Sequence, residues 1–165
     1  GSPVLAITVV DYPLGAATAT TKLQAADDAL RLGADELDMV LNLGLLKSGR
    51  AGQAQLEVAA VASLVHAAGA RLKLILETAL LTPDEKLRAC ALARAAGCDF
   101  LKTSTGTIPN GGATVEDVAL LRAQAAPGMG VKAAGGIRTP ALARALLAAG
   151  ASRLGTTHPR ALLGG

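Results

Sequence analysis

Short runs of apolar and β-branched residues alternate along the chain with longer stretches in which apolar residues recur at helical spacing. Runs of this length predict buried strands, whereas apolar positions three and four residues apart predict the inward face of a helix. Six runs are expected to be strands: residues 4–10, 36–42, 71–78, 99–104, 130–134 and 152–157. Strands that alternate with helices in this way predict a parallel β-sheet with helices packed against it.

The predicted helices begin and end at recognisable capping residues. In LTPDEK, Thr82 is expected to cap a helix, with Pro83 in its first position and Glu85 three residues after the cap, as a capping box requires. Thr114, with Asp117 three residues later, and Thr139, followed by Pro140, each repeat part of this arrangement. Helix-to-strand corners with a glycine in the place of a left-handed residue are predicted at 33–35, 68–71, 96–99 and 149–152. The same corner therefore recurs along the chain.

Six βα units in 165 residues predict one domain, because no linker to a second one interrupts them. We expect residues 4–165 to form this domain and residues 1–3 to be a cloning remnant and lead-in. A closed eight-stranded barrel needs two more units and about 250 residues. The pattern therefore leaves two α/β architectures open: an open doubly wound sheet, or a TIM-type (β/α) barrel with units missing.

Composition and charge narrow the range of partners. Hydrophobic residues make up 51% of the chain, but Tyr12 and Phe100 are its only aromatic residues, so no platform for stacking bases is available. The net charge of +3 comes from scattered basic residues, and we expect no nucleic-acid partner. Charges or glycines interrupt every apolar run before it reaches roughly 18 residues, so no membrane span is expected. Cys90 and Cys98 lack metal-ligand or disulfide spacing, and without a signal peptide we expect reduced thiols in a cytoplasmic protein.

Charged residues lie within or at the ends of several predicted strands, where parallel α/β proteins bind ligands. They are Asp38, Lys73, Glu77, Lys102 and Lys132. Lys102 and Lys132 end consecutive strands, which are commonly neighbours, and two close ammonium groups lower the pKa of one of them. The resulting neutral amine can attack a carbonyl to form a Schiff base, with Asp38 moving protons through a water. The alternative is that these charges form structural salt bridges, since buried charges need partners.

Two stretches rich in glycine and hydroxyl groups predict an anion site. GGIRTP places Gly135 and Gly136 ahead of a helix N-terminus, and LGTT ends the last predicted strand with Thr156 and Thr157. Backbone N–H groups and the helix dipole favour phosphate at such a position. The alternative is that the two glycines are turn residues only. His158 follows directly and is expected to shape this loop rather than to take part in catalysis.

The chain resembles the deoxyribose-phosphate aldolase family in six motifs that occur in the family's order: ELDMVLNLGLLKSG, LKLILETALLT, DFLKTSTG, GGATVEDV, VKAAGGIRT and ASRLGTT. The resemblance extends from Val4 to Gly165. It implies a TIM-type barrel and a class I aldolase that uses no metal or other cofactor. The activity that it implies is the reversible cleavage of 2-deoxyribose 5-phosphate to glyceraldehyde 3-phosphate and acetaldehyde.

The resemblance also implies a role for each matching residue. Lys102 matches the Schiff-base lysine, Lys132 the lysine that lowers the pKa of that amine, and Asp38 the acid/base carboxylate. Lys73 and Glu77 match charged positions with a supporting role. The residues that match the substrate and phosphate contacts are Thr105, Gly106, Gly135, Gly136, Thr156 and Thr157.

The chain departs from the family pattern at several points. Members of the family begin with two further βα units, which close the barrel, so the resemblance implies that this chain opens at the family's third strand. Asp11 stands where the family usually has glycine, and TTHPR replaces a run of serine and glycine at the phosphate loop. Two other functions therefore stay open: an aldolase for small unphosphorylated aldehydes, or a non-catalytic fragment that binds sugar phosphate weakly. Because an unclosed sheet exposes strand edges, we expect either a homo-oligomer that covers them or a contracted barrel.

Overall fold

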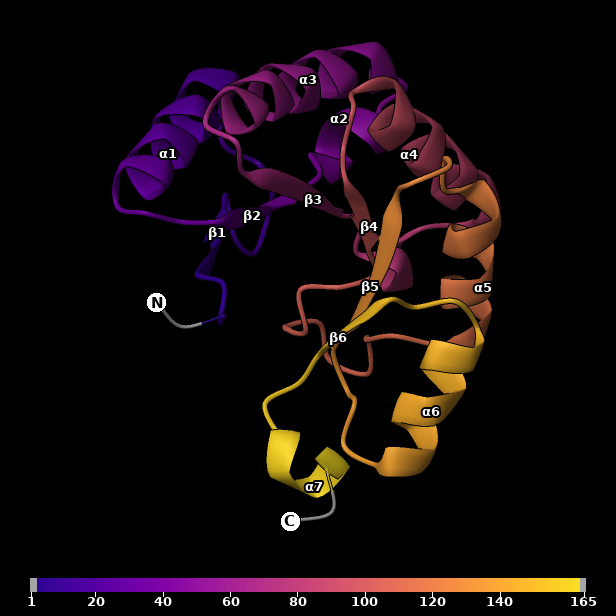
Figure 1. The fold of residues 1–165 in the computed structure, drawn as a ribbon. Helices are drawn as coiled ribbons and strands as arrows, with labels where there is room; N and C mark the ends of the chain where they lie inside the picture. The colour runs from indigo at the N-terminus through magenta and orange to yellow at the C-terminus, as the bar shows by residue number, and fades with distance from the viewer. Residues whose placement is uncertain (1–2, 164–165) are drawn as a thin grey trace.

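The computed structural model describes residues 3–163, which form six strands, seven α-helices and one 3-10 helix (Figure 1). The strands are β1 (Ile7–Val10), β2 (Glu36–Val40), β3 (Arg71–Ile75), β4 (Phe100–Lys102), β5 (Gly130–Ala134) and β6 (Arg153–Gly155). The helices are α1 (Ala19–Arg31), α2 (Leu43–Lys47), α3 (Ala51–Ala67), α4 (Pro83–Ala95), α5 (Val115–Gln124), α6 (Pro140–Ala148) and α7 (Pro159–Leu163), with the 3-10 helix η1 (Thr78–Leu80). The predicted βα alternation is confirmed.

All six strands are parallel, and their order in the sheet is their order in the chain. The sheet curls into a half-barrel, with helices α1, α3, α4, α5 and α6 along its outer side (Figure 1). This consecutive order excludes the doubly wound alternative, in which the strand order reverses at a switch point. The TIM-type barrel with six units is therefore confirmed. Within residues 3–163, β1 and β6 each pair with one strand only, so the sheet does not close.

Side chains of the strands alternate between a core on the outer, helix-covered side and a charged layer on the concave side. Leu37, Leu72, Leu101 and Val131 are fully buried in the hydrophobic core. The next residue on each of these strands is Asp38, Lys73, Lys102 and Lys132 respectively, and all four are buried as well. The period of two therefore places a row of charges on one inner face of the sheet.

Local signals of the helix starts are confirmed. Thr82 forms the predicted capping box with Glu85, and the side chains of Thr114 and Thr139 accept hydrogen bonds from backbone N–H groups in the first turns of their helices. The predicted carboxyl ends are correct for β1 and β5 but two or three residues too late for β2, β3, β4 and β6. β3, expected to reach residue 78, ends at Ile75, because Glu77 adopts a left-handed conformation with φ of 52° and leads into η1.

Two further observations on the described part of the chain concern membrane-spanning helices and the cysteines. No helix within residues 3–163 is long and apolar enough to cross a bilayer. Cys90 and Cys98 are free and buried, and burial raises the pKa of their thiols to about 11 and about 12. Residues 1 and 2, assigned to a cloning remnant, lie outside the described residues. That assignment and the cytoplasmic location stay predictions.

Candidate active site

Three lysines meet one carboxylate on the concave side of the sheet. Asp38 on β2 is the register partner of Lys73 on β3, and Lys102 on β4 is the register partner of Lys132 on β5. Asp38 Oδ1 accepts a hydrogen bond from Lys73 Nζ at 2.7 Å. Asp38 Oδ2 accepts one from Lys102 Nζ and one from Lys132 Nζ, each at 2.7 Å. The two strand-end lysines are therefore neighbours, as predicted, and Asp38 contacts both amines directly rather than through a water.

In this cluster, the neighbouring charges and burial shift the pKa values of Asp38 and Lys132. Burial opposes ionisation of Asp38, but the charge of Lys102 and hydrogen bonds from Lys102, Lys132 and Lys73 outweigh it and lower the pKa of Asp38 to about 2. Burial lowers the pKa of Lys132, against the attraction of Asp38, and the charges of Lys102 and Lys73 lower it further. A permanent carboxylate thus lies beside an amine that loses its proton readily.

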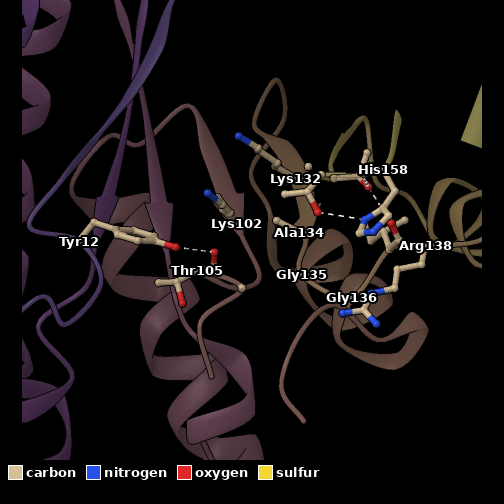
Figure 2. Close-up of a pocket in the computed structure, with 14 residues that line it drawn as sticks. Tyr12, Lys102, Thr105, Lys132, Ala134, Gly135, Gly136, Arg138 and His158 are labelled. Carbon is tan, nitrogen blue, oxygen red and sulfur yellow. Dashed lines mark hydrogen bonds between the residues drawn. The ribbon is translucent and has the colours of Figure 1, made fainter. Parts of the chain in front are cut away.

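Lys102 and Lys132 border a pocket of about 340 Å³ at the carboxyl ends of the strands (Figure 2). Its wall includes all the predicted substrate and phosphate residues: Thr105, Gly106, Gly135, Gly136, Thr156 and Thr157. Asp38, Lys73 and Glu77 do not line the pocket but are buried behind it. The pocket therefore offers amines, hydroxyls and backbone N–H groups to a ligand. Within residues 3–163, no group of three or more His, Cys, Asp and Glu could hold a metal ion.

Gly135, the first residue of the glycine pair between β5 and α6, packs closely against neighbouring backbone. Gly135 has φ of 87°, and a Cβ there would lie 3.0 Å from Gly112 Cα and 3.2 Å from Gly106 Cα. Three backbone segments therefore approach one another at a distance that only glycine permits. Gly106 and Gly135 both line the pocket, so this close approach shapes its wall, while a role of the glycine pair in binding an anion stays a prediction.

The loop after β6 is tied to the glycine loop. Thr156 Oγ1 donates a hydrogen bond to Ile137 O at 2.7 Å and accepts one from His158 N at 2.9 Å. The hydroxyl of Thr156 thus joins the two loops, while Thr157 and His158 share a side-chain hydrogen bond of 3.0 Å. His158 and Arg138 lie on the same side of the pocket, opposite Tyr12 (Figure 2). Two side chains that can carry positive charge thus flank the predicted anion site.

Glu77 fixes the loop that follows β4. The side chain is buried, and its Oε2 accepts hydrogen bonds from Thr105 N at 3.0 Å and from the Thr105 hydroxyl. A residue other than glycine held at positive φ costs on the order of 1 kcal/mol, so these bonds must hold Glu77 in place. Glu77 therefore orients Thr105 beside Lys102, which fits the supporting role that the family resemblance implied.

Four residues of the site were missed by sequence reasoning: Tyr12, Glu36, Arg138 and Arg153. The Tyr12 hydroxyl donates to Thr105 O at 3.1 Å, and the ring borders the pocket (Figure 2). Glu36 is buried behind the cluster, and its Oε2 lies 2.7 Å from the Nζ of Lys73 and contacts Arg153. A signal for Glu36 existed, because it lies two residues before Asp38 and so faces the same side of the strand.

Comparison with known proteins places this arrangement in context. The chain matches the DeoC/LacD family of aldolases over residues 8–160. It is 52% identical over 149 residues to the deoxyribose-phosphate aldolase of Thermococcus gammatolerans, and the alignment covers 90% of this chain and 66% of that protein. It is 49% identical over 166 aligned residues to that of Streptococcus pneumoniae serotype 19F, covering 100% and 74% of the two chains.

The structure is similar to the tetrameric deoxyribose phosphate aldolase of Aeropyrum pernix, with a TM-score of 0.89 and 36% sequence identity over 98% of this chain and 67% of that one. The chain thus spans just under two thirds of the length of the Thermococcus relative and somewhat more of the others.

Proposed function

The chain belongs to the DeoC/LacD family of aldolases, and we propose that it is a class I aldolase that reversibly cleaves 2-deoxyribose 5-phosphate to glyceraldehyde 3-phosphate and acetaldehyde. One observation carries this proposal: Lys102 and Lys132 share a single carboxylate oxygen at the border of a pocket. Two buried amines on one anion favour the loss of a proton, and a neutral amine is the nucleophile that a Schiff base requires.

In this proposal, Lys102 Nζ attacks carbon 1 of the open-chain sugar. The new nitrogen–carbon bond forms while the carbonyl oxygen takes up protons and leaves as water, which gives a protonated Schiff base. The positive nitrogen then accepts the electron pair of the bond between carbons 2 and 3, as the 3-hydroxyl loses its proton. Glyceraldehyde 3-phosphate leaves, the remaining enamine is protonated on carbon, and hydrolysis releases acetaldehyde. Asp38 and Lys132 are the groups close enough to move these protons.

The opposite side of the pocket is proposed to hold the phosphate. Gly135 and Gly136 precede the N-terminus of α6, where backbone N–H groups and the helix dipole favour an anion. Arg138 and His158 flank the same place. An aldolase for unphosphorylated aldehydes is the second candidate, since His158 stands in the loop where the family resemblance leads us to expect serine or glycine.

Reductive trapping tests the reaction. Incubation with acetaldehyde and borohydride should add an ethyl group to Lys102, located by peptide mass spectrometry, and Lys102→Met should abolish it. Absence of any lysine adduct would reject the Schiff-base mechanism, and an adduct on Lys132 alone would reverse the roles of the two amines. Retro-aldol rates with deoxyribose 5-phosphate and with deoxyribose then separate the two candidates, because only the first predicts a preference for the phosphorylated sugar.

We further propose that a second copy of the chain covers the open edge at β1. Ile7 and Val9 are 42% and 44% exposed, and they are register partners of Glu36 and Asp38, so they lie on the concave side beside this edge. Exposed apolar side chains along an edge strand favour pairing with another chain. Sedimentation should show an oligomer that Val9→Lys dissociates. Leu56→Lys, a change of the same kind at an exposed site on α3, should leave it intact; a monomeric unmodified chain would reject the proposal.

A further inference from the structure

A second layer of charges lies behind the lysine cluster, toward the amino-terminal ends of the strands. Glu36 lies two residues before Asp38 on β2, and Arg153 on β6 is the register partner of Lys132. Glu36 Oε2 lies 2.7 Å from Lys73 Nζ and accepts a hydrogen bond from Arg153 Nη1. Glu36 and Arg153 are therefore joined to the lysine cluster through the ammonium group of Lys73.

Lys73 is the centre of this arrangement. It is fully buried, and its Nζ lies 2.7 Å from a carboxylate oxygen on each side, Asp38 Oδ1 and Glu36 Oε2. The charged groups of the two layers come from five strands: Glu36 and Asp38 from β2, Lys73 from β3, Lys102 from β4, Lys132 from β5 and Arg153 from β6. Four cations against two anions leave a formal charge of +2 when every group is ionised. Each charge therefore alters the protonation of the others.

Arg153 is partly exposed, but an aromatic ring holds its guanidinium group in place. Its guanidinium carbon lies 4.8 Å from the centre of the Phe100 ring, and Lys73 Nζ lies 5.9 Å from the same centre. A cation over an aromatic face is attracted by the negative face of the ring. Phe100 therefore holds the cations of Arg153 and Lys73 close to Glu36.

The buried carboxylate of Glu36 lowers the stability of the folded state. Burial opposes its ionisation, but hydrogen bonds and charges from Lys73 and Arg153 lower its pKa, so it is a carboxylate at neutral pH. Its Oε1 is buried and has no hydrogen-bond partner among residues 3–163. A buried polar atom without a partner destabilises the folded state. Glu36 is therefore a buried carboxylate that Lys73 and Arg153 hold in its charged form, at a cost in stability.

We propose that Glu36 and Arg153 are positioning residues that set the protonation of the lysine pair through Lys73. The negative charge of Glu36 offsets the repulsion that Lys73 exerts on the lysine pair. The positive charge of Arg153 in turn offsets part of the attraction that Glu36 exerts on protons of the pair. Without the charge of Glu36, Lys73 repels the two amines more strongly, so Lys102 and Lys132 lose protons at lower pH. Without the charge of Arg153, Glu36 attracts protons to the cluster and the effect reverses. The consequence for catalysis rests on the proposed aldolase function, whereas the electrostatic effect does not.

NMR titration of lysine side chains labelled with ¹³C at the ε-carbon measures this effect without any carbonyl substrate. Relative to the unmodified chain, Glu36→Gln should lower the titration midpoint of the Lys102 and Lys132 signals by about one pH unit, and Arg153→Gln should raise it by a similar amount. Arg153→Lys keeps the positive charge and should restore most of the original midpoint. Arg31→Gln removes the same charge from the exposed side of α1 and should cause no shift.

The sign of the two shifts decides the proposal. A structural role alone would affect both variants in the same direction, so shifts of equal sign, or none, would overturn it. If Glu36→Gln does not fold, as judged by circular dichroism, Arg153→Gln decides alone, since its side chain is only partly buried; an unraised midpoint then overturns the proposal. Opposite shifts in a chain that shows no reductive trapping would support this proposal and reject the aldolase function.

Discussion

Replacement of Asp38 by asparagine removes the single carboxylate that three lysines share, with little change in side-chain shape. The pKa of Asp38 is lowered from 3.8 to about 2, which corresponds to about 2.5 kcal/mol of stability at neutral pH. Because the pKa is lower in the folded state, this stabilisation is complete above the unfolded value of 3.8 and is lost as the pH falls toward 2.

We therefore expect Asp38→Asn to lower the free energy of unfolding at pH 7 by about 2.5 kcal/mol, measured by urea denaturation with circular dichroism. The difference from the unmodified chain should narrow between about pH 4 and pH 2, as Asp38 itself becomes protonated. Asp27→Asn is the matched control, because Asp27 forms a 2.9 Å pair with Arg31 on the surface of α1, and its loss should cost less than about 0.5 kcal/mol. Equal losses in the two variants, or a difference that does not depend on pH, would refute the reasoning.

Two further predictions concern the amine pair and the close backbone contact at Gly135. Lys132→Met removes a neighbouring ammonium group, so the pH profile of reductive trapping at Lys102 should move to higher pH; an unchanged profile would reject the coupling of the two amines. Gly135→Ala should raise the KM for deoxyribose 5-phosphate more than that for deoxyribose, because the new Cβ meets the backbone of Gly112 at 3.0 Å. Gly128→Ala, at a φ of 82° with nothing within 4 Å, controls for backbone strain, and equal KM changes for both sugars would contradict a phosphate site at Gly135.

The amine pair could be predicted from the sequence because it depends on neighbouring strands. Lys102 and Lys132 end consecutive strands, and consecutive parallel strands joined by one helix commonly pair. Gly135 and Gly136 were singled out for a similar reason, since GGIRTP combines a turn with a helix start in one local segment, but the close approach of Gly135 to Gly106 and Gly112 was not predicted. Local and nearest-neighbour features of this kind need no knowledge of the whole sheet. The same limit explains why a doubly wound sheet could not be excluded: both architectures contain parallel strands with intervening helices.

The contact between Glu36 and Arg153 could not be predicted, because it depends on the curvature of the sheet. Glu36 on β2 and Arg153 on β6 are 117 residues apart in the chain and three strands lie between them in the sheet. Their side chains meet only because the sheet curls into a half-barrel (Figure 1). No spacing rule relates residues at such a distance. The left-handed conformation of Glu77 was missed for a different reason: glutamate rarely adopts positive φ, so nothing local indicates that β3 ends before it.

The register of β4 against β5 determines whether the two amines meet at all. Lys102 lies opposite Lys132, and two residues earlier Phe100 lies opposite Gly130. A slip of one residue would turn Lys132 toward the helices and place an apolar side chain beside Lys102. A Cβ on Gly130 would overlap the Phe100 ring, so this ring fits in register only against glycine. Phe100 also holds Arg153 and Lys73 by cation–ring contacts. One aromatic side chain therefore helps to set the register of β4 against β5 and to place the charged groups behind the lysine pair.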